Sequence, residues 1–171
     1  MAEESSTGAR AESVRAPVLV LGLGNDLISD DGFGPVVARA CEAAGLAARP
    51  GVEIVEASVA GFHLLDLIQG RRRVLILDVV RTGQRHPGAL FPLRVEEASA
   101  GRALGGSHSI DLATALELGR HVGATMPEEI AILVAEAVDL ETIREELTPA
   151  VAGAVPVAVA RVAAWLDGER V

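Results

Sequence analysis

Apolar residues in this chain alternate between two periods, and this alternation limits the fold more than any other feature of the sequence. The run Val18–Leu23 is short and nearly uninterrupted, as in a buried strand, whereas residues 34–44 place apolar side chains at i, i+3, i+4 and i+7, as on one helical face. Further strands are expected at 52–59, 74–80, 89–95 and 130–138, and further helices at 61–68, 110–122 and 148–165. Strands that alternate with helices indicate a mainly parallel sheet covered on both faces.

The predicted fold class is therefore α/β, a three-layer sandwich in which a mixed, mainly parallel five-stranded sheet has helices on both faces. Residues 74–80, "VLILDVV", are apolar on both faces and are expected at the centre of the sheet, whereas residues 89–95 alternate more and suit an edge. A length of 171 residues with 50% hydrophobic residues is enough for one substantial core. We expect a single domain at residues 17–171, after a flexible N-terminal tail at residues 1–16.

Composition excludes several classes of function. The one cysteine, Cys41, leaves no internal disulfide and no multi-cysteine metal site, which fits a reducing compartment. A net charge of -9 would repel a phosphate backbone, so nucleic acid is not an expected partner. The basic cluster at residues 71–73 is interpreted as a solvated connection, with contact to an acidic partner surface as the alternative.

No segment for export or membrane insertion is expected. Residues 1–16 lack the apolar block of a secretion signal. The strand-like run Val18–Leu23 is far shorter than the roughly 20 residues needed to cross a bilayer. These features predict a cytoplasmic protein that does not contact a membrane.

Two carboxylates follow predicted strands and stand out as candidate functional groups. Asp31 lies after the glycine turn that ends the first strand, and Asp78 lies at the end of the "VLILD" segment. In a parallel sheet, ligands bind beyond the carboxyl ends of the strands, so these two side chains are expected to open into one crevice. A carboxylate at an apolar strand end is costly unless it is paired or binds a metal ion.

Two other enzyme classes fit the sequence poorly. The segment "GLGNDL" begins like a dinucleotide fingerprint, but it lacks the third glycine and is followed by Asp30 and Asp31, which would repel a pyrophosphate. There is no G-x-S-x-G motif for a serine hydrolase. Cys41 falls on the apolar face of a predicted helix, where a structural thiol is expected rather than a nucleophile. Asn25 is expected to hold the glycine turn through hydrogen bonds to the backbone.

The histidines determine what the two carboxylates can bind. His108, in the loop "GGSHSIDL", is placed to return to the same edge of the sheet. Asp31, Asp78 and His108 would form an incomplete oxygen, oxygen and nitrogen site that suits Ni²⁺ or Zn²⁺ better than Mg²⁺ or Ca²⁺. His63 and His121 fall on predicted helices and are interpreted as structural, which leaves His86 as the competing histidine.

Several segments resemble the hydrogenase maturation proteases, the nickel-dependent endopeptidases that trim the large subunit of nickel-iron hydrogenases. The segments that carry the resemblance are "VLGLGNDLISDDGFGPVVARA" (20–40), "ASVAGFHLLDLI" (57–68), "LILDVV" (75–80), "GGSHSIDLATAL" (105–116) and "LTPAVAGAVPVAVARVAAWL" (147–166). The resemblance implies that Asp31, Asp78 and His108 contact nickel and carry the catalysis. In the family the residue at position 31 is often Glu, and Asp31 is shorter by one methylene.

The resemblance further implies an endopeptidase that removes the C-terminal extension of a hydrogenase large-subunit precursor after nickel insertion. The precursor would supply the nickel, which serves as a recognition signal and is not permanently bound by the protease. Peptide hydrolysis would be metal-assisted, without a covalent nucleophile, and the protease is expected to be a monomer. Which residue acts as general base is left open. The alternative is a non-catalytic metal-sensing or chaperone module that holds an immature metalloprotein.

Overall fold

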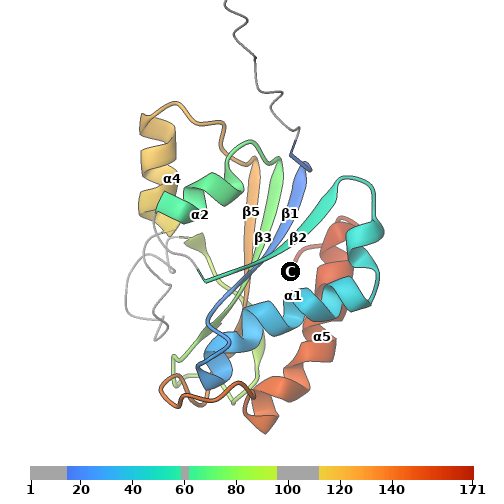
Figure 1. Ribbon diagram of the computed structural model, residues 1–171, viewed down its shortest axis with the longest axis vertical. Helices are drawn as coiled ribbons and strands as arrows, with labels where there is room; N and C mark the ends of the chain where they lie inside the picture. Colours follow the sequence, from blue (N-terminus) through green and yellow to red (C-terminus); the bar gives the residue numbers. More distant parts are fainter. Residues whose placement is uncertain (1–14, 59–61, 96–111) are drawn as a thin grey trace, which may run out of the picture.

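The computed structural model describes residues 15–58, 62–95 and 112–171, and its centre is a five-stranded sheet in the order β2-β1-β3-β5-β4 (Figure 1). The strands are β1 (Val18–Leu23), β2 (Val52–Ala57), β3 (Arg73–Val80), β4 (Leu90–Pro92) and β5 (Glu129–Glu136). The first four strands in that spatial order pair in parallel, and β4 pairs antiparallel with β5 at the edge. The prediction of a mixed, mainly parallel sheet with residues 74–80 at its centre is confirmed. The predicted edge strand at 89–95 is shorter than expected, because only Leu90–Pro92 pairs.

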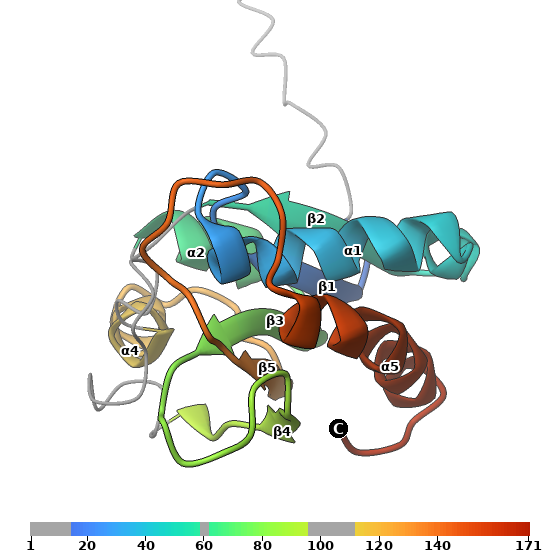
Figure 2. The same cartoon turned by 90° about the horizontal axis from the view of Figure 1, so that it is seen from below.

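Helices cover both faces of the sheet, which confirms the predicted three layers (Figures 1 and 2). One face carries α1 (Phe33–Ala43) and α5 (Pro149–Leu166), and the other carries α2 (Phe62–Ile68) and α4 (Leu112–His121). Two short 3-10 helices, η1 (Ser29–Gly32) and η2 (Leu46–Ala48), flank α1. The proposed tail at residues 1–16 remains a prediction, because residues 1–14 lie outside the described part of the chain.

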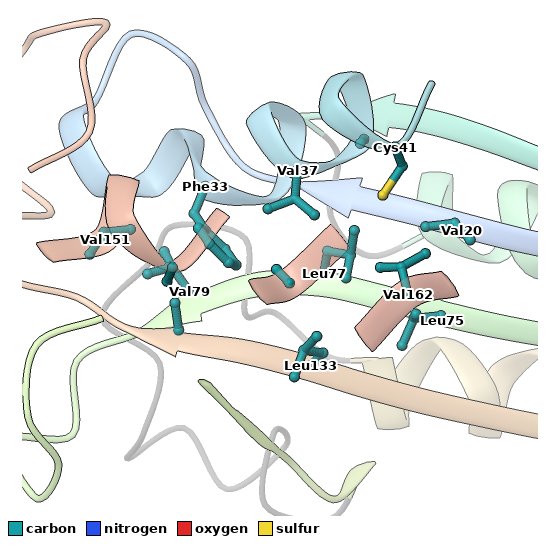
Figure 3. Close-up of a cluster of buried hydrophobic side chains, with 14 of the residues drawn as sticks. Val20, Phe33, Val37, Cys41, Leu75, Leu77, Val79, Leu133, Val151 and Val162 are labelled. Atoms are coloured by element: carbon teal, nitrogen blue, oxygen red, sulfur yellow. The ribbon is translucent and has the colours of Figure 1, made fainter. Parts of the chain in front are cut away.

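Alternation along β3 builds two separate cores. Leu75, Leu77 and Val79 face α1 and α5, where they pack with side chains such as Phe33 and Val162 (Figure 3). Val74, Ile76 and Val80 face α2 and α4. Successive side chains of a strand point to opposite faces, so a strand that is apolar throughout must be covered on both sides.

Helix α5 is long and apolar enough, by length and composition, to cross a membrane, a property that the sequence interpretation overlooked. Its inward side nevertheless belongs to the core: Val151, Ala154, Ala158, Val162 and Trp165 are buried. The fully buried indole of Trp165 donates a hydrogen bond of 2.9 Å to Glu129 at the start of β5. Packing against α1 and the sheet accounts for this inward side, and 28% of the apolar 18-residue window is buried inside the fold.

The arginine cluster at residues 71–73 is not the solvated connection that the sequence suggested. The side chain of Arg71 is buried and pairs with Glu53 at 2.6 Å. Arg73 pairs with Glu129 at 2.6 Å and lies over the Trp165 ring at 4.2 Å. Both arginines stabilise the amino end of the sheet through ion pairs, and the guanidinium of Arg73 stacks on Trp165 as well.

The first turn of α1 lies directly on the carboxyl ends of β1 and β3. A Cβ atom on Gly34 would overlap the carbonyl oxygens of Leu23 and Leu77, the latter at 2.5 Å. A Cβ atom on Gly22 would lie 2.7 Å from the carbonyl carbon of Gly34 and 2.9 Å from the Cβ of Ala38. The two glycines let the helix backbone touch the strand backbones, which places the preceding η1 turn at this edge of the sheet.

We expect Gly34→Ala to lower the free energy of unfolding by about 2–3 kcal/mol, because the added methyl group meets backbone that cannot move aside. Gly153→Ala, in the interior of α5, is the matched control: a Cβ there meets nothing within 4 Å. That variant should gain about 0.5–1 kcal/mol from the higher helix propensity of alanine. Urea denaturation measures both, and equal stability of the two variants would contradict the close approach.

Candidate active site

The carboxyl ends of β1 and β3 form a crevice at the point where the strand order reverses. The chain passes from β1 through α1 to β2 on one side of β1, and then through α2 on the other face of the sheet to β3 on the other side of β1. This arrangement is the usual ligand position in open parallel sheets. Asp31 in η1 and Asp78 near the end of β3 both lie here, as the sequence predicted.

The two carboxylates are close enough to repel each other. Asp31 is only 2% exposed, and Asp78 is partly buried. The pKa of Asp78 is raised from 3.8 to about 7, mainly by burial. A 2.7 Å hydrogen bond from the Val79 N–H to Asp78 Oδ1 lowers it, and the charge of Asp31 raises it. A pair of like charges in a partly desolvated crevice favours either a proton or a cation between them.

Asn25 fixes the turn that carries Asp31, which confirms the role expected from the sequence. Its Oδ1 accepts a 3.0 Å hydrogen bond from the backbone N–H of Leu27. Its own N–H is directed at Asp31, with 3.1 Å to Oδ2 and 3.3 Å to the carbonyl oxygen. Gly24 has a φ of +149°, and a Cβ at that residue would collide with the Asp31 carbonyl oxygen. The start of the turn, at Gly24 and Asn25, therefore contacts Asp31 at its end and fixes the position of that residue.

Asp30 has a structural role that the sequence reasoning did not identify. Its carboxylate is fully buried and accepts hydrogen bonds from the N–H groups of Val138 (2.8 Å), Asp139 (2.9 Å) and Thr148 (2.8 Å) and from the Thr148 hydroxyl (3.1 Å). It therefore joins η1 to the end of β5 and to the start of α5. Consecutive residues of a 3-10 helix point about 120° apart, so adjacent aspartates face different surroundings. No sequence signal distinguishes the anchoring carboxylate from the one in the crevice.

Residues 137–148, between β5 and α5, run beside the η1 turn (Figure 2). Backbone hydrogen bonds join Ser29 N to Thr142 O at 3.1 Å and Arg144 N to Leu27 O at 3.0 Å, and Ile28 forms a bridge with Ile143. The wall of the crevice is thereby tied to the turn that carries Asp31. A site built from several loops gains rigidity from such cross-links.

The predicted third ligand, His108, lies outside the described residues. Within the described ranges, no group of three or more His, Cys, Asp and Glu side chains that could hold a metal ion is found. His63 lies on the exposed side of α2, and His121 lies in the last turn of α4, as expected of structural histidines. His86 is exposed beside Pro87 in the β3–β4 loop. The set of Asp31, Asp78 and His108 therefore remains a prediction, of which the structure brings the two carboxylates together.

Cys41 lies on the buried face of α1 and is fully enclosed, as predicted (Figure 3). Burial raises the pKa of its thiol to about 11, which disfavours the nucleophilic thiolate. The thiol therefore takes no part in the crevice.

The fold and the acidic pair define a three-layer α/β protein with its ligand site at the switch point of the sheet. A family model for the HycI hydrogenase maturation proteases matches residues 35–165. The hydrogenase expression/formation protein HupD of Rhodobacter capsulatus is 30% identical over 146 residues, which cover 84% of this chain and 68% of HupD. The hydrogenase 2 maturation protease of Escherichia coli is 34% identical over 83 residues, or 48% of this chain and 50% of that protein.

Solved structures agree with the sequence comparisons. The hydrogenase maturating endopeptidase HybD from E. coli superimposes with a TM-score of 0.74 at 27% identity and covers 88% of this chain and 91% of its own. The chain belongs to the hydrogenase maturation protease family.

We expect Asp78→Asn to stabilise the protein in the absence of metal. The gain should appear at neutral and alkaline pH and be absent at acidic pH. Between about pH 4 and 7 the folded protein keeps a proton on Asp78 that the unfolded chain has lost, so stability falls as pH rises through this window. Asn cannot ionise but keeps the acceptor for the Val79 N–H. The gain should be of the order of 1–3 kcal/mol at pH 8 and near zero at pH 4, since one pKa unit is worth about 1.4 kcal/mol. Urea denaturation at both pH values measures it, and a gain that does not depend on pH would refute this account.

Proposed function

We propose that this chain is the endopeptidase that removes the C-terminal extension of a nickel-iron hydrogenase large-subunit precursor after nickel insertion. The precursor supplies the nickel, and the protease recognises it and holds no resident metal of its own. The observation that carries the proposal is the pair of carboxylates, Asp31 and Asp78, at the switch point of a sheet with the family's fold. His108 completes the proposed ligand set with a nitrogen donor.

The chemistry of the pair suits a cation that arrives with the substrate. Two carboxylates that repel each other in a partly buried crevice gain from a divalent ion, because it replaces repulsion by attraction on both sides. Carboxylate oxygens with one imidazole nitrogen are an acceptable donor set for Ni²⁺. A precursor without nickel would leave the repulsion in place, so the site discriminates between loaded and unloaded precursors.

In the proposed hydrolysis the cation would act as a Lewis acid and polarise the scissile carbonyl for attack by water. The chain's own residues fix the geometry. The Asn25 N–H donates to Asp31 Oδ2, and Asp30 anchors the η1 turn to the start of α5. The Val79 N–H donates to Asp78 Oδ1 and leaves Asp78 Oδ2 for the ligand. No covalent nucleophile takes part in this reaction, and Cys41 lies in the core.

Three exposed apolar side chains in segments bound to the η1 turn support a protein substrate. Leu27 is 58% exposed, Val138 is 46% exposed and Ile143 is 85% exposed, and all three lie in segments that are hydrogen-bonded to η1 or its flanking turn. We call these three residues the apolar rim. Exposed apolar side chains that cluster beside a polar site are typical of protein docking surfaces. We further propose that the protein works as a monomer in the cytoplasm.

Processing should depend on both carboxylates and on nickel in the precursor. The wild-type protein should shorten a nickel-loaded precursor and leave a nickel-free precursor intact. Asp78→Asn and His108→Ala should lower the rate of cleavage at least ~100-fold while the fold is retained, because each removes a ligand. Asp31→Glu should keep part of the activity, since it preserves the charge and the ligand type. Gel mobility of the precursor measures all of these.

Cys41→Ala is the control for these variants, because it alters a buried group that the reaction does not use. It should cleave at a rate close to that of the wild type. Equal trimming of loaded and nickel-free precursors would eliminate nickel recognition. Tight binding of the loaded precursor without any shortening would instead favour the metal-sensing or chaperone hypothesis.

The apolar rim is tested by Ile143→Glu, with Val122→Glu as the matched control. Val122 is 66% exposed and follows α4, on the way to the amino end of β5, so both substitutions place a charge on an exposed apolar side chain. Ile143→Glu should raise KM for the precursor about 5- to 50-fold, as for loss of one apolar anchor of an interface. Val122→Glu should leave KM unchanged. Similar effects of the two substitutions would show that the rim is not a docking surface.

A further inference from the structure

A groove of about 490 Å³ lies between α5 and the β3–β4 loop, outside the crevice that holds Asp31 and Asp78. Its floor is made of small and apolar residues, among them Ala150, Gly153 and Val157 of α5. Its rim carries Arg85 and His86 on the loop and Arg161 on the helix. The lining residues in the described part of the chain include no Asp or Glu, although the whole chain has a net charge of -9.

On the rim of the groove, Arg85 and Arg161 have no acidic partner, unlike five of the other arginines in the described part of the chain. Ion pairs within 4.0 Å are found for Arg39, Arg49, Arg71, Arg73 and Arg81. Among the described residues, no carboxylate lies within that distance of Arg85 or Arg161. In an acidic protein, a local pair of unneutralised guanidinium groups attracts a negatively charged ligand.

The groove is preformed. The Arg85 guanidinium lies 4.2 Å from the centroid of the Phe91 ring, which restrains its position. Glu136 is buried at the end of β5 and accepts hydrogen bonds from the N–H groups of Thr82 and Gly83, both at 2.7 Å. At the other end of the loop, Gly88 packs so closely on Ala150 that a Cβ would overlap the Ala150 carbonyl oxygen. A site that is ordered before binding loses less entropy when a ligand enters.

The groove lies along α5, and the residue before this helix, Thr148, is hydrogen-bonded to the η1 turn that also carries Asp31. Ala150 is two residues from Thr148, whose N–H and hydroxyl bind the Asp30 carboxylate, and Asp30 adjoins Asp31. From Ala150 to Arg161, α5 rises about 16 Å at 1.5 Å per residue. An extended peptide advances about 3.3 Å per residue, so roughly five residues of a bound chain would span this length. A polypeptide that passes the crevice can therefore continue into the groove.

We propose that this groove binds an extended acidic segment of the precursor protein, with carboxylates at Arg85 and Arg161 and small side chains over Gly153. This inference rests on the proposed function for the identity of the partner, but the preference for an acidic peptide follows from the groove alone. A guanidinium group can form two parallel hydrogen bonds with one carboxylate. The small side chains at Ala150 and Gly153 on the floor of the groove let the backbone of a bound peptide approach α5 closely. The segment acts as a second contact that raises the affinity of a substrate held at the crevice.

The test is a double charge reversal, Arg85→Glu with Arg161→Glu, in the full-length protein. The control, Arg120→Glu with Arg170→Glu, changes the net charge equally at exposed sites at the end of α4 and near the C-terminus. Binding of a fluorescently labelled hexaglutamate peptide is measured by anisotropy at low ionic strength. The kinetics of trimming of the nickel-loaded precursor give KM and kcat separately.

The groove variant should bind the peptide about 3- to 30-fold more weakly than the control variant and raise KM for the precursor by a similar factor, as for the loss of two exposed ion pairs. Its kcat should stay unchanged, because the crevice is untouched. Equal binding of the peptide by the two double variants would overturn the proposal, and so would an equal KM for a precursor that the wild type trims. A wild-type protein that binds the peptide through the groove but trims no precursor would contradict the proposed protease function and leave the acidic-peptide site standing.

Discussion

Direct contact between the backbone of α1 and the ends of β1 and β3 is the constraint on which the active-site edge depends. Gly34 has no room for a side chain against the carbonyl oxygens of Leu23 and Leu77. A side chain on Gly22 would in turn collide with atoms of α1. The helix therefore starts within contact distance of the strands, and η1 lies directly above them. This contact brings Asp31 to Asp78 without a long connecting loop.

The acidic residues in this region divide the work between stability and function. Asp30 is fully satisfied by donors from the β5–α5 segment, so its buried charge is compensated. Burial raises the pKa of Asp78, the one backbone N–H that it accepts lowers the pKa, and the charge of Asp31 raises it again. Structural carboxylates and candidate ligands can thus be separated by what surrounds them. A crevice in which two carboxylates repel each other favours a cation, and the proposed function uses that property.

A single proposed substrate path connects three features that lie far apart in the sequence. The apolar rim lies in segments that are hydrogen-bonded to the η1 turn and its flanks, and the cationic groove runs along α5. The Asp30 hydrogen bonds hold the start of α5 next to the crevice, so the groove and the acidic pair are fixed relative to each other. Metal recognition at one end and charge recognition at the other would make correct processing depend on two independent properties of the precursor.

The sequence by itself determined the layers of the fold, because the periods of apolar residues specify strands and helices locally and "VLILDVV" can only be a strand covered on both faces. It also identified Asp31 and Asp78, since residues after parallel strands converge at one edge. The tertiary structure alone decided that Asp30 is an anchor and Asp31 faces the crevice, because a 3-10 turn points adjacent side chains in different directions. It also decided that Arg71 and Arg73 are paired whereas Arg85 and Arg161 are not, because the partners of a charge lie in other parts of the chain.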